Sequence, residues 1–168
     1  MADRWIFWLM LTLVLAGCSR KPPYVGKSVE ELERMLDDPN PTVQTQGAHG
    51  LSLLGAEARP ALPALCRTLH ASDSLVRQQA ALALGEMGSQ AEEAVPTLIE
   101  ALHDSEWSVR RQAALALGQI GPAARAAEPE LRRCQRDSHT VVRKAATLAL
   151  GKIKGESKRD AAKGASSP

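Results

Sequence analysis

The chain has 168 residues, 44% of them apolar and only 3% aromatic, and its formal net charge at pH 7 is +2. This length fits one domain of ordinary size. Proteins that bind single-stranded nucleic acid stack the bases on aromatic side chains. Because Trp107 is the only aromatic residue after Tyr24, the composition argues against nucleic acid as a partner.

The first 17 residues have the pattern of a targeting segment. A twelve-residue apolar run, Trp5–Ala16, follows a short polar start, and it is too short to cross a bilayer, which takes about 20 residues. The run leads into Leu15-Ala16-Gly17-Cys18, which resembles the lipobox of bacterial lipoproteins. The resemblance implies cleavage before Cys18 and a lipid anchor on Cys18 in the bacterial cell envelope. Ser19 would favour the outer membrane where there are two membranes. The alternative is an ordinary secretory signal in which Cys18 is incidental.

Residues 18–27 are expected to form a lipidated tether that keeps the folded part near the membrane surface. The next four residues, Ser28-Val29-Glu30-Glu31, form a capping-box pattern, which predicts the start of a helix. Residues 28–154 are expected to form one repeat domain. Residues 155–168 lose all periodicity and are expected to form a disordered basic tail.

Four valines mark a unit that returns every 33 residues: Val43, Val76, Val109 and Val142. A period of this length is typical of proteins built from stacked repeats. In the third copy, VRRQAALALGQI at residues 109–120, the apolar residues recur three and four positions apart. This spacing predicts an amphipathic helix in each unit.

A second helix is expected in each unit, beginning near Pro63, Pro96 and Pro129, because proline is tolerated in the first turn of a helix. Gly88 and Gly121 stand where the first helix of the unit should stop. No useful stretch alternates with a period of two. The chain is therefore predicted to be all-α.

Two cysteines, Cys66 and Cys134, lie within the repeats, two units apart. Helices in adjacent layers are spaced roughly 8–10 Å apart, which puts these residues beyond the Cα separation of about 7 Å that a disulfide allows. Both are expected to be small buried apolar residues. No Cys–His or Cys-x-x-Cys spacing points to a metal site or a cofactor.

The unit VRRQAALALGQIG, with Asp before it and Pro after it, resembles the HEAT-like repeat of the phycobilisome-lyase type. The resemblance covers roughly residues 28–154, about three and a half repeats. It implies a right-handed α-solenoid with the second helices on the concave side and a role in binding protein surfaces. Deoxyhypusine hydroxylase, a HEAT-type enzyme, binds iron through His-Glu pairs. The four histidines here precede Gly50, Ala71, Asp104 and Thr140, so no catalytic residue and no metal ligand is expected.

The outward stripe of the second helices is the candidate binding surface. Its members recur in register: Arg67 and His70 with Ala64, Glu100 and His103 with Thr97, and Arg133 and Arg136 with Glu130. The alternative is a charged face that only contacts solvent. His70 and His103 also allow a metal or pH-switch interpretation, but their place at the last turn of a helix favours a role in stabilising the helix dipole.

Arg77, Arg110 and Arg143 recur beside the turns that carry Asp73, Asp104 and Asp137. We expect hydrogen-bonded pairs that tie one repeat to the next. The chain is thus interpreted as a membrane-anchored adaptor that binds an unidentified envelope protein, as a monomer or within a hetero-complex. The alternatives are a structural assembly subunit of an envelope complex and, less favoured, a HEAT-type lyase or oxidoreductase.

Overall fold

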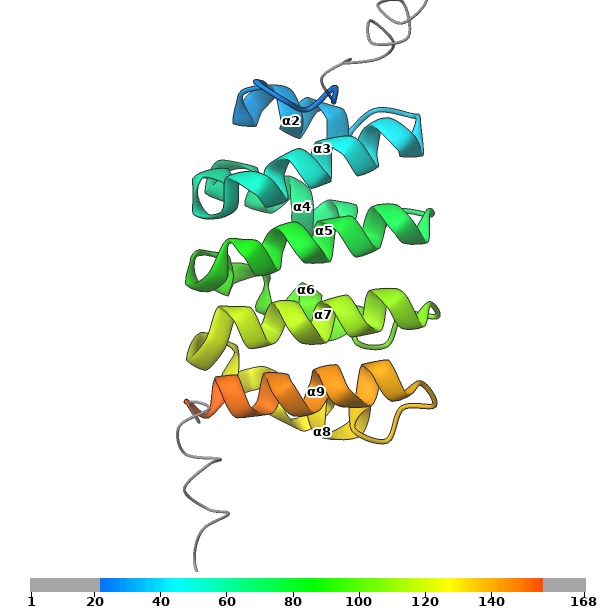
Figure 1. Ribbon diagram of the computed structural model, residues 1–168, viewed down its shortest axis with the longest axis vertical. Helices are drawn as coiled ribbons and strands as arrows, with labels where there is room; N and C mark the ends of the chain where they lie inside the picture. The colour runs from blue at the N-terminus through cyan, green and yellow to red at the C-terminus, as the bar shows by residue number, and fades with distance from the viewer. Residues whose placement is uncertain (1–21, 156–168) are drawn as a thin grey trace, which may run out of the picture.

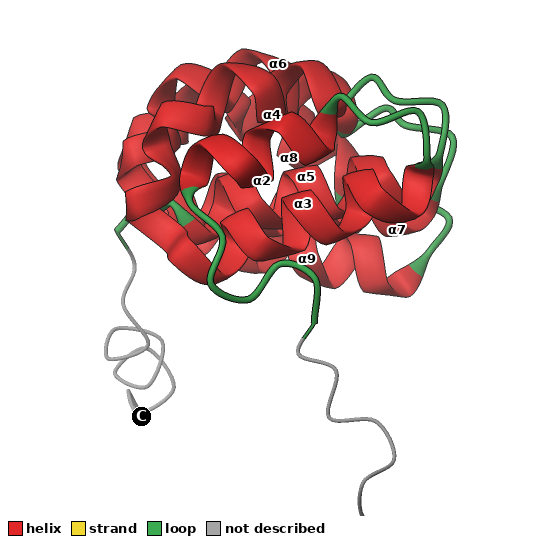
Figure 2. Ribbon diagram, turned by 90° about the horizontal axis from the view of Figure 1, so that it is seen from above, coloured by secondary structure: helices red, strands yellow, loops and turns green. Residues whose placement is uncertain are grey.

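Four pairs of helices stack in chain order in the computed structural model, which describes residues 22–155 (Figure 1). Each pair, called a layer below, is a short helix followed by a long one. The layers are α2 (Val29–Leu36) with α3 (Pro41–Leu54), α4 (Leu62–Thr68) with α5 (Ser74–Glu86), α6 (Val95–Ala101) with α7 (Trp107–Ile120), and α8 (Glu128–Cys134) with α9 (Thr140–Ile153). The long helices lie on one side of the stack and the short helices on the other (Figure 2). The described part holds no strand, and the predicted all-α solenoid is confirmed.

A tight turn of 3-10 helix joins each long helix to the short helix of the next layer. These segments are η1 (Gly55–Ala61), η2 (Gly88–Ala94) and η3 (Gly121–Ala127). Their first residues are glycines with φ of 53°, 57° and 76°, a conformation that other residues avoid. The predicted stops at Gly88 and Gly121 are therefore confirmed. The prolines predicted at the start of the short helices occupy the first turn of α4, α6 and α8.

Small residues bring the long helices of adjacent layers close together. The side chains of Ala80, Ala113 and Ala146 are fully buried along the predicted apolar stripe, as are Leu84 and Leu117. A Cβ added at Gly118 would lie only 2.8 Å from the Cα of Ala149 in the next layer. Contact of this closeness maximises dispersion between backbones and leaves no room for a larger side chain.

The first layer is covered by the segment that precedes it. The capping box is present, with the Ser28 side chain accepting from the backbone N–H of Glu31. Residues 23–26 form a turn, and Tyr24 packs on the core with its ring edge-on to His49 at 4.9 Å. The tether expected over residues 18–27 thus includes a part, from Pro22 on, that is a packed turn.

Glycines in α3 allow this cover to pack closely. A Cβ at Gly47 would lie 2.8 Å from the Cβ of Met35, and one at Gly50 would lie 2.9 Å from the Cβ of Tyr24. Glycine within a helix lowers its intrinsic stability by about 1 kcal/mol relative to alanine. Because these glycines have no side chain, α2 and Tyr24 can pack directly against the backbone of α3.

The predicted leader, Cys18, and residues 156–168 of the predicted tail lie outside the described residues. Within residues 22–155, no helix combines the length and apolar character needed to cross a bilayer.

Candidate functional site

The six residues predicted to form a binding surface are all exposed on the side of the short helices. We call them the short-helix row: Arg67, His70, Glu100, His103, Arg133 and Arg136. The helices α4, α6 and α8 each carry one residue of the row, and the next member follows two residues after each of these helices ends. Ala64, expected on the same stripe, is 1% exposed; that expectation was wrong, because Ala64 faces the core.

Charges in the short-helix row pair from one layer to the next. Arg67 lies 4.0 Å from Asp37, at the end of α2, and His70 lies 3.9 Å from Glu100. His103 Nε2 lies 3.0 Å from a carboxylate oxygen of Glu130 in the next layer. Exposed pairs of this kind stabilise a protein by about 0–1 kcal/mol. The row therefore keeps its charges available to a partner at small cost.

The histidines of the row stand just beyond the carboxyl ends of their helices. The backbone N–H of His70 donates to the carbonyl of Arg67 at 3.0 Å, and that of His103 donates to the carbonyl of Glu100 at 3.0 Å. A cation at this end of a helix is favoured by the helix dipole. The geometry agrees with the predicted role at the helix end. No group of three or more potential metal ligands occurs among residues 22–155.

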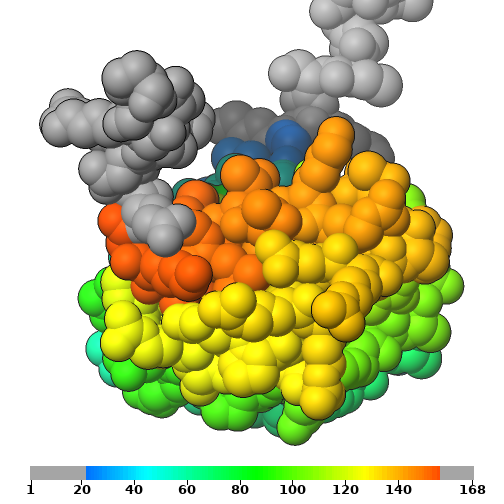
Figure 3. All heavy atoms as spheres, turned by 90° about the horizontal axis from the view of Figure 1, so that it is seen from below, coloured from blue at the N-terminus to red at the C-terminus, as the bar shows by residue number. Residues whose placement is uncertain are grey.

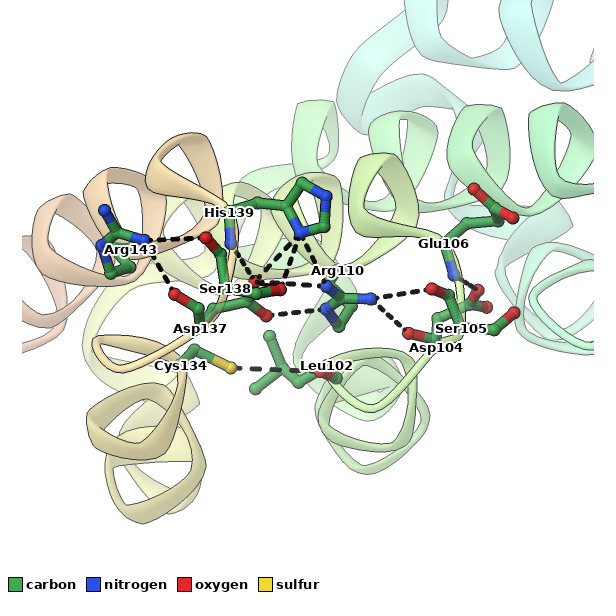
Figure 4. A network of polar contacts seen from close by, with 10 residues as sticks. All are labelled: Leu102, Asp104, Ser105, Glu106, Arg110, Cys134, Asp137, Ser138, His139 and Arg143. Carbon is green, nitrogen blue, oxygen red and sulfur yellow. Dashed lines mark hydrogen bonds and ion pairs between the residues drawn. The ribbon is translucent and has the colours of Figure 1, made fainter.

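A second set of charged residues ties the layers together through the turns before the long helices. Arg110 on α7 donates through Nη1 to the carbonyls of Asp104 and Ser105, in the turn of its own layer, both within 2.9 Å. Its Nε and Nη2 donate to the carboxylate of Asp137, in the turn of the next layer, at 2.8 and 3.2 Å (Figure 4). Bidentate pairs of this type are strong and geometrically specific. The arginine thus clamps two layers.

Arg77 makes the same contacts one layer earlier, with its Nε 2.7 Å from the carboxylate of Asp104. The predicted pairing of arginines with turn carboxylates is confirmed at these two places, and we call the set the arginine ladder. The expected pairing of Asp73 was wrong, because its carboxylate accepts from the backbone N–H of Leu75 and Val76 and caps α5.

The pKa of Asp137 shows how strongly this contact favours the charged form. Hydrogen bonds from Arg110 lower it to about 2, against the opposing effect of burial, and the backbone N–H of His139 contributes further. Both partners are well covered, with side-chain exposures of 13% for Arg110 and 11% for Asp137. An ion pair shielded in this way keeps more of its strength than one on the open surface.

The ladder has no rung between the first two layers. Gln44 stands where the later layers have arginine, and it reaches only the carbonyl of Asp38 in its own turn, at 2.7 Å. Ala71 stands where the next layers have Asp104 and Asp137. The interface between the first two layers therefore lacks the arginine–carboxylate contact of the later ones.

Two features that were not predicted lie near the C-terminal layer. Trp107 stacks on His139 of the next layer, with 5.8 Å between the ring centroids, and stays 42% exposed. Leu148 on α9 is 59% exposed, although the equivalent Leu115 is partly buried against the core.

Cys66 and Cys134 are free thiols, and burial raises the pKa of both.

The sequence model of the family described as HEAT repeats matches residues 29–105 and 95–165, which together span most of the chain. The chain belongs to the HEAT-repeat family. A search of curated proteins found no match.

Solved structures similar to this HEAT-repeat chain include an enzyme and an engineered protein. Human deoxyhypusine hydroxylase in complex with glycerol is 31% identical, with a TM-score of 0.63 over 80% of this chain and 46% of that one. An engineered protein is 27% identical, with a TM-score of 0.65 over 76% of this chain and 64% of that one.

Two further structures share the fold at lower identity. A designed armadillo repeat protein in complex with the peptide (KR)4 is 20% identical, with a TM-score of 0.65 over 74% of this chain and 64% of that one. The complex of CpcE and CpcF of phycocyanin lyase from Nostoc sp. PCC7120 is 23% identical, with a TM-score of 0.64 over 73% of this chain and 79% of that one. The chain spans less than two thirds of the first structures it matches.

Proposed function

We propose that this HEAT-repeat chain is a non-catalytic adaptor, anchored to a membrane of the bacterial envelope through lipid on Cys18, that binds another envelope protein along the short-helix row. The observation that carries the proposal is the row itself, six exposed residues of mixed charge that recur in register on one side of the solenoid. Repeat proteins use such extended surfaces to bind other proteins.

Mixed charge on the row indicates the chemistry of the partner. Arg67, Arg133 and Arg136 would pair with carboxylates, and Glu100 with a basic residue. Complementary charges of this kind contribute more to specificity and to the rate of association than to raw affinity. The partner is therefore expected to carry an alternating charge pattern along one face, with binding that weakens as salt concentration rises.

Charge reversal along the row tests the proposal. The full-length lipoprotein and its Arg67→Glu/Glu100→Arg/Arg133→Glu variant would each be used to capture proteins from detergent-solubilised membranes. Arg111 on α7 is exposed and lies outside the row, so Arg111→Glu is the matched control. We expect a partner that the wild type and the control retain and the row variant loses. Retention of every partner by the row variant contradicts the proposal.

The lipid anchor is tested separately. Mass spectrometry should show that the mature chain begins at Cys18 and that Cys18 carries the acyl chains. The Cys18→Ala variant should be released from membranes after export. Two or more acyl chains give a stable anchor where one gives only marginal binding. A Cys18→Ala variant that still fractionates with membranes would refute the anchor and leave the proposed protein-binding role standing.

A further inference from the structure

The last long helix keeps the features that the inner layers use to hold the layer after them. In α5 and α7, an added Cβ at Gly85 or Gly118 would lie 3.0 or 2.8 Å from an alanine Cα of the following helix. Gly151 holds the same place in α9, and a Cβ there would have no atom of residues 22–155 within 4 Å. The end of the stack, seen in Figure 3, thus leaves room for a closely packed helix.

Arg143 holds the position of the ladder arginines on this open face. Its Nη1 donates to the carbonyls of Asp137 and Ser138 at 2.8 and 3.0 Å, as Arg110 does in its own turn. Its Nη2 donates to the hydroxyl of Thr140 at 2.7 Å. No carboxylate lies within 4.0 Å of Arg143 among residues 22–155. The guanidinium is therefore held in a position from which it can donate hydrogen bonds to a carboxylate of a further layer.

An open hollow of about 420 Å³ lies beside Arg143. It is lined by Gln135, Thr140, Arg143, Lys144, Thr147 and Leu148. Leu148 is the large apolar side chain in it, and its exposure of 59% gives an incoming helix apolar surface to cover.

The surroundings of the hollow are strongly basic. Between Arg132 and Gly155 the chain has seven Lys and Arg against one acidic residue, Asp137, a net charge of +6. A partner for this face must therefore supply carboxylates.

Thr147 on this face is larger than its counterparts in the inner layers, because it replaces the fully buried Ala81 and Ala114. Its hydroxyl donates to the carbonyl of Arg143 at 3.0 Å and accepts from Gln135 at 3.2 Å. The hydroxyl is thus satisfied within the chain, so covering it strands no polar group. The added volume requires small residues opposite.

A second copy of the chain fits this face poorly. Asp38 shares the register of Asp104 and Asp137, but Tyr24 covers the first layer at Gly50, where a preceding layer would have to pack. Two C-terminal faces brought together would oppose two basic surfaces, and like charges in an interface are unfavourable.

We propose that the open C-terminal face, formed by α9 with α8, is a docking edge for a helical layer of another repeat protein. That layer places a carboxylate against Arg143 and small residues against Gly151. The edge lies at the opposite end of the stack from α2 (Figure 1).

The probe for this proposal is a designed HEAT-repeat protein whose first layer copies the acidic residues 89–121, so that its copy of Asp104 faces Arg143. Binding of the full-length lipoprotein in detergent is measured by calorimetry. We expect a one-to-one complex that weakens about tenfold or more with Gly151→Ala, with Arg143→Gln, and with a probe carrying Asn at the copied aspartate. Arg111→Gln on α7 is the matched control and should leave the affinity unchanged.

Gly151→Ala is the decisive variant, because it adds a methyl group in open space and leaves the fold of the free chain intact. Equal affinity of the probe for the wild type and for Gly151→Ala overturns the proposal. Two other outcomes also overturn it. Binding of the Cys18→Ala protein, which lacks the proposed anchor, to phosphatidylglycerol vesicles that Arg143→Gln abolishes assigns the face to lipid, and concentration-dependent self-association that Gly151→Ala abolishes assigns it to a second copy.

Discussion

Alanine at two glycines that share one register should have opposite effects on stability. In an exposed helix, Gly→Ala stabilises by about 0.5–1 kcal/mol. At Gly151 an added Cβ meets no atom within 4 Å in the described part of the chain, so the full gain is expected. At Gly118 the same atom would lie 2.8 Å from the Cα and 3.1 Å from the Cβ of Ala149, well inside the contact distance of about 3.5–4.0 Å between carbons.

The clash at Gly118 involves the backbone, which a rotamer change cannot relieve. Overpacking of this kind costs about 1–3 kcal/mol, which equals or exceeds the gain in helix propensity. Gly118→Ala should therefore range from neutral to about 2 kcal/mol destabilising. The difference between the two variants isolates the cost of separating α7 from α9 and should be about 1–3 kcal/mol.

Urea unfolding followed by circular dichroism measures both variants under the same conditions. The midpoints are comparable if the m-values stay unchanged. We expect a higher midpoint for Gly151→Ala than for the wild type and a lower or equal midpoint for Gly118→Ala. The same upward shift in both variants would refute the close packing between layers described above.

Three further predictions concern the ladder and the first helix. The pKa of Asp137 is lowered to about 2, so its contact with Arg110 stabilises the fold fully when the pH is above the ordinary aspartate pKa of about 4. This stabilisation is lost as the pH falls from about 4 towards 2. Asp137→Asn should therefore flatten the dependence of the urea midpoint on pH in this range. Adding the missing rung with Gln44→Arg and Ala71→Asp together should stabilise the fold by about 1 kcal/mol, and a double-mutant cycle should show that neither change does so alone. Ser28→Ala should cost about 1 kcal/mol through loss of the capping box, measured as a lower urea midpoint.

Most of the fold follows from one period in the sequence. The valines 33 residues apart, with glycine at the end of the first three long helices and proline at the start of α4, α6 and α8, place the helices of residues 41–153. These signals work because backbone geometry is local, since glycine alone reaches positive φ easily and proline is tolerated only in the first turn.

Side-chain partners were harder to predict than helices. Asp73 and Asp104 both stand near a ladder arginine in the sequence, but only Asp104 shares the register of Asp38 and Asp137. Comparing positions across the copies would have distinguished the capping aspartate from the pairing one. The same comparison would have indicated that Ala64 is buried, because this alanine stands where the later copies have the polar residues Thr97 and Glu130.

The ends of the stack could not be predicted from the repeat, because each inner layer is defined by neighbours on both sides. Tyr24 lies outside the period, and nothing in the sequence around it indicates that it covers Gly50. Leu148 reads like Leu115 in the sequence, and only the structure shows that no layer of residues 22–155 covers it.

The most direct test of the adaptor role is site-specific photo-crosslinking in cells. A photoreactive residue in place of Arg133, whose side chain is 75% exposed on the short-helix row, is compared with the same residue in place of Arg111 on the long-helix side. We predict a cross-link from position 133 to one envelope protein, absent from position 111 and lost when Glu100 is reversed to Arg. No cross-link from position 133, or the same products from both positions, would contradict binding along the short-helix row.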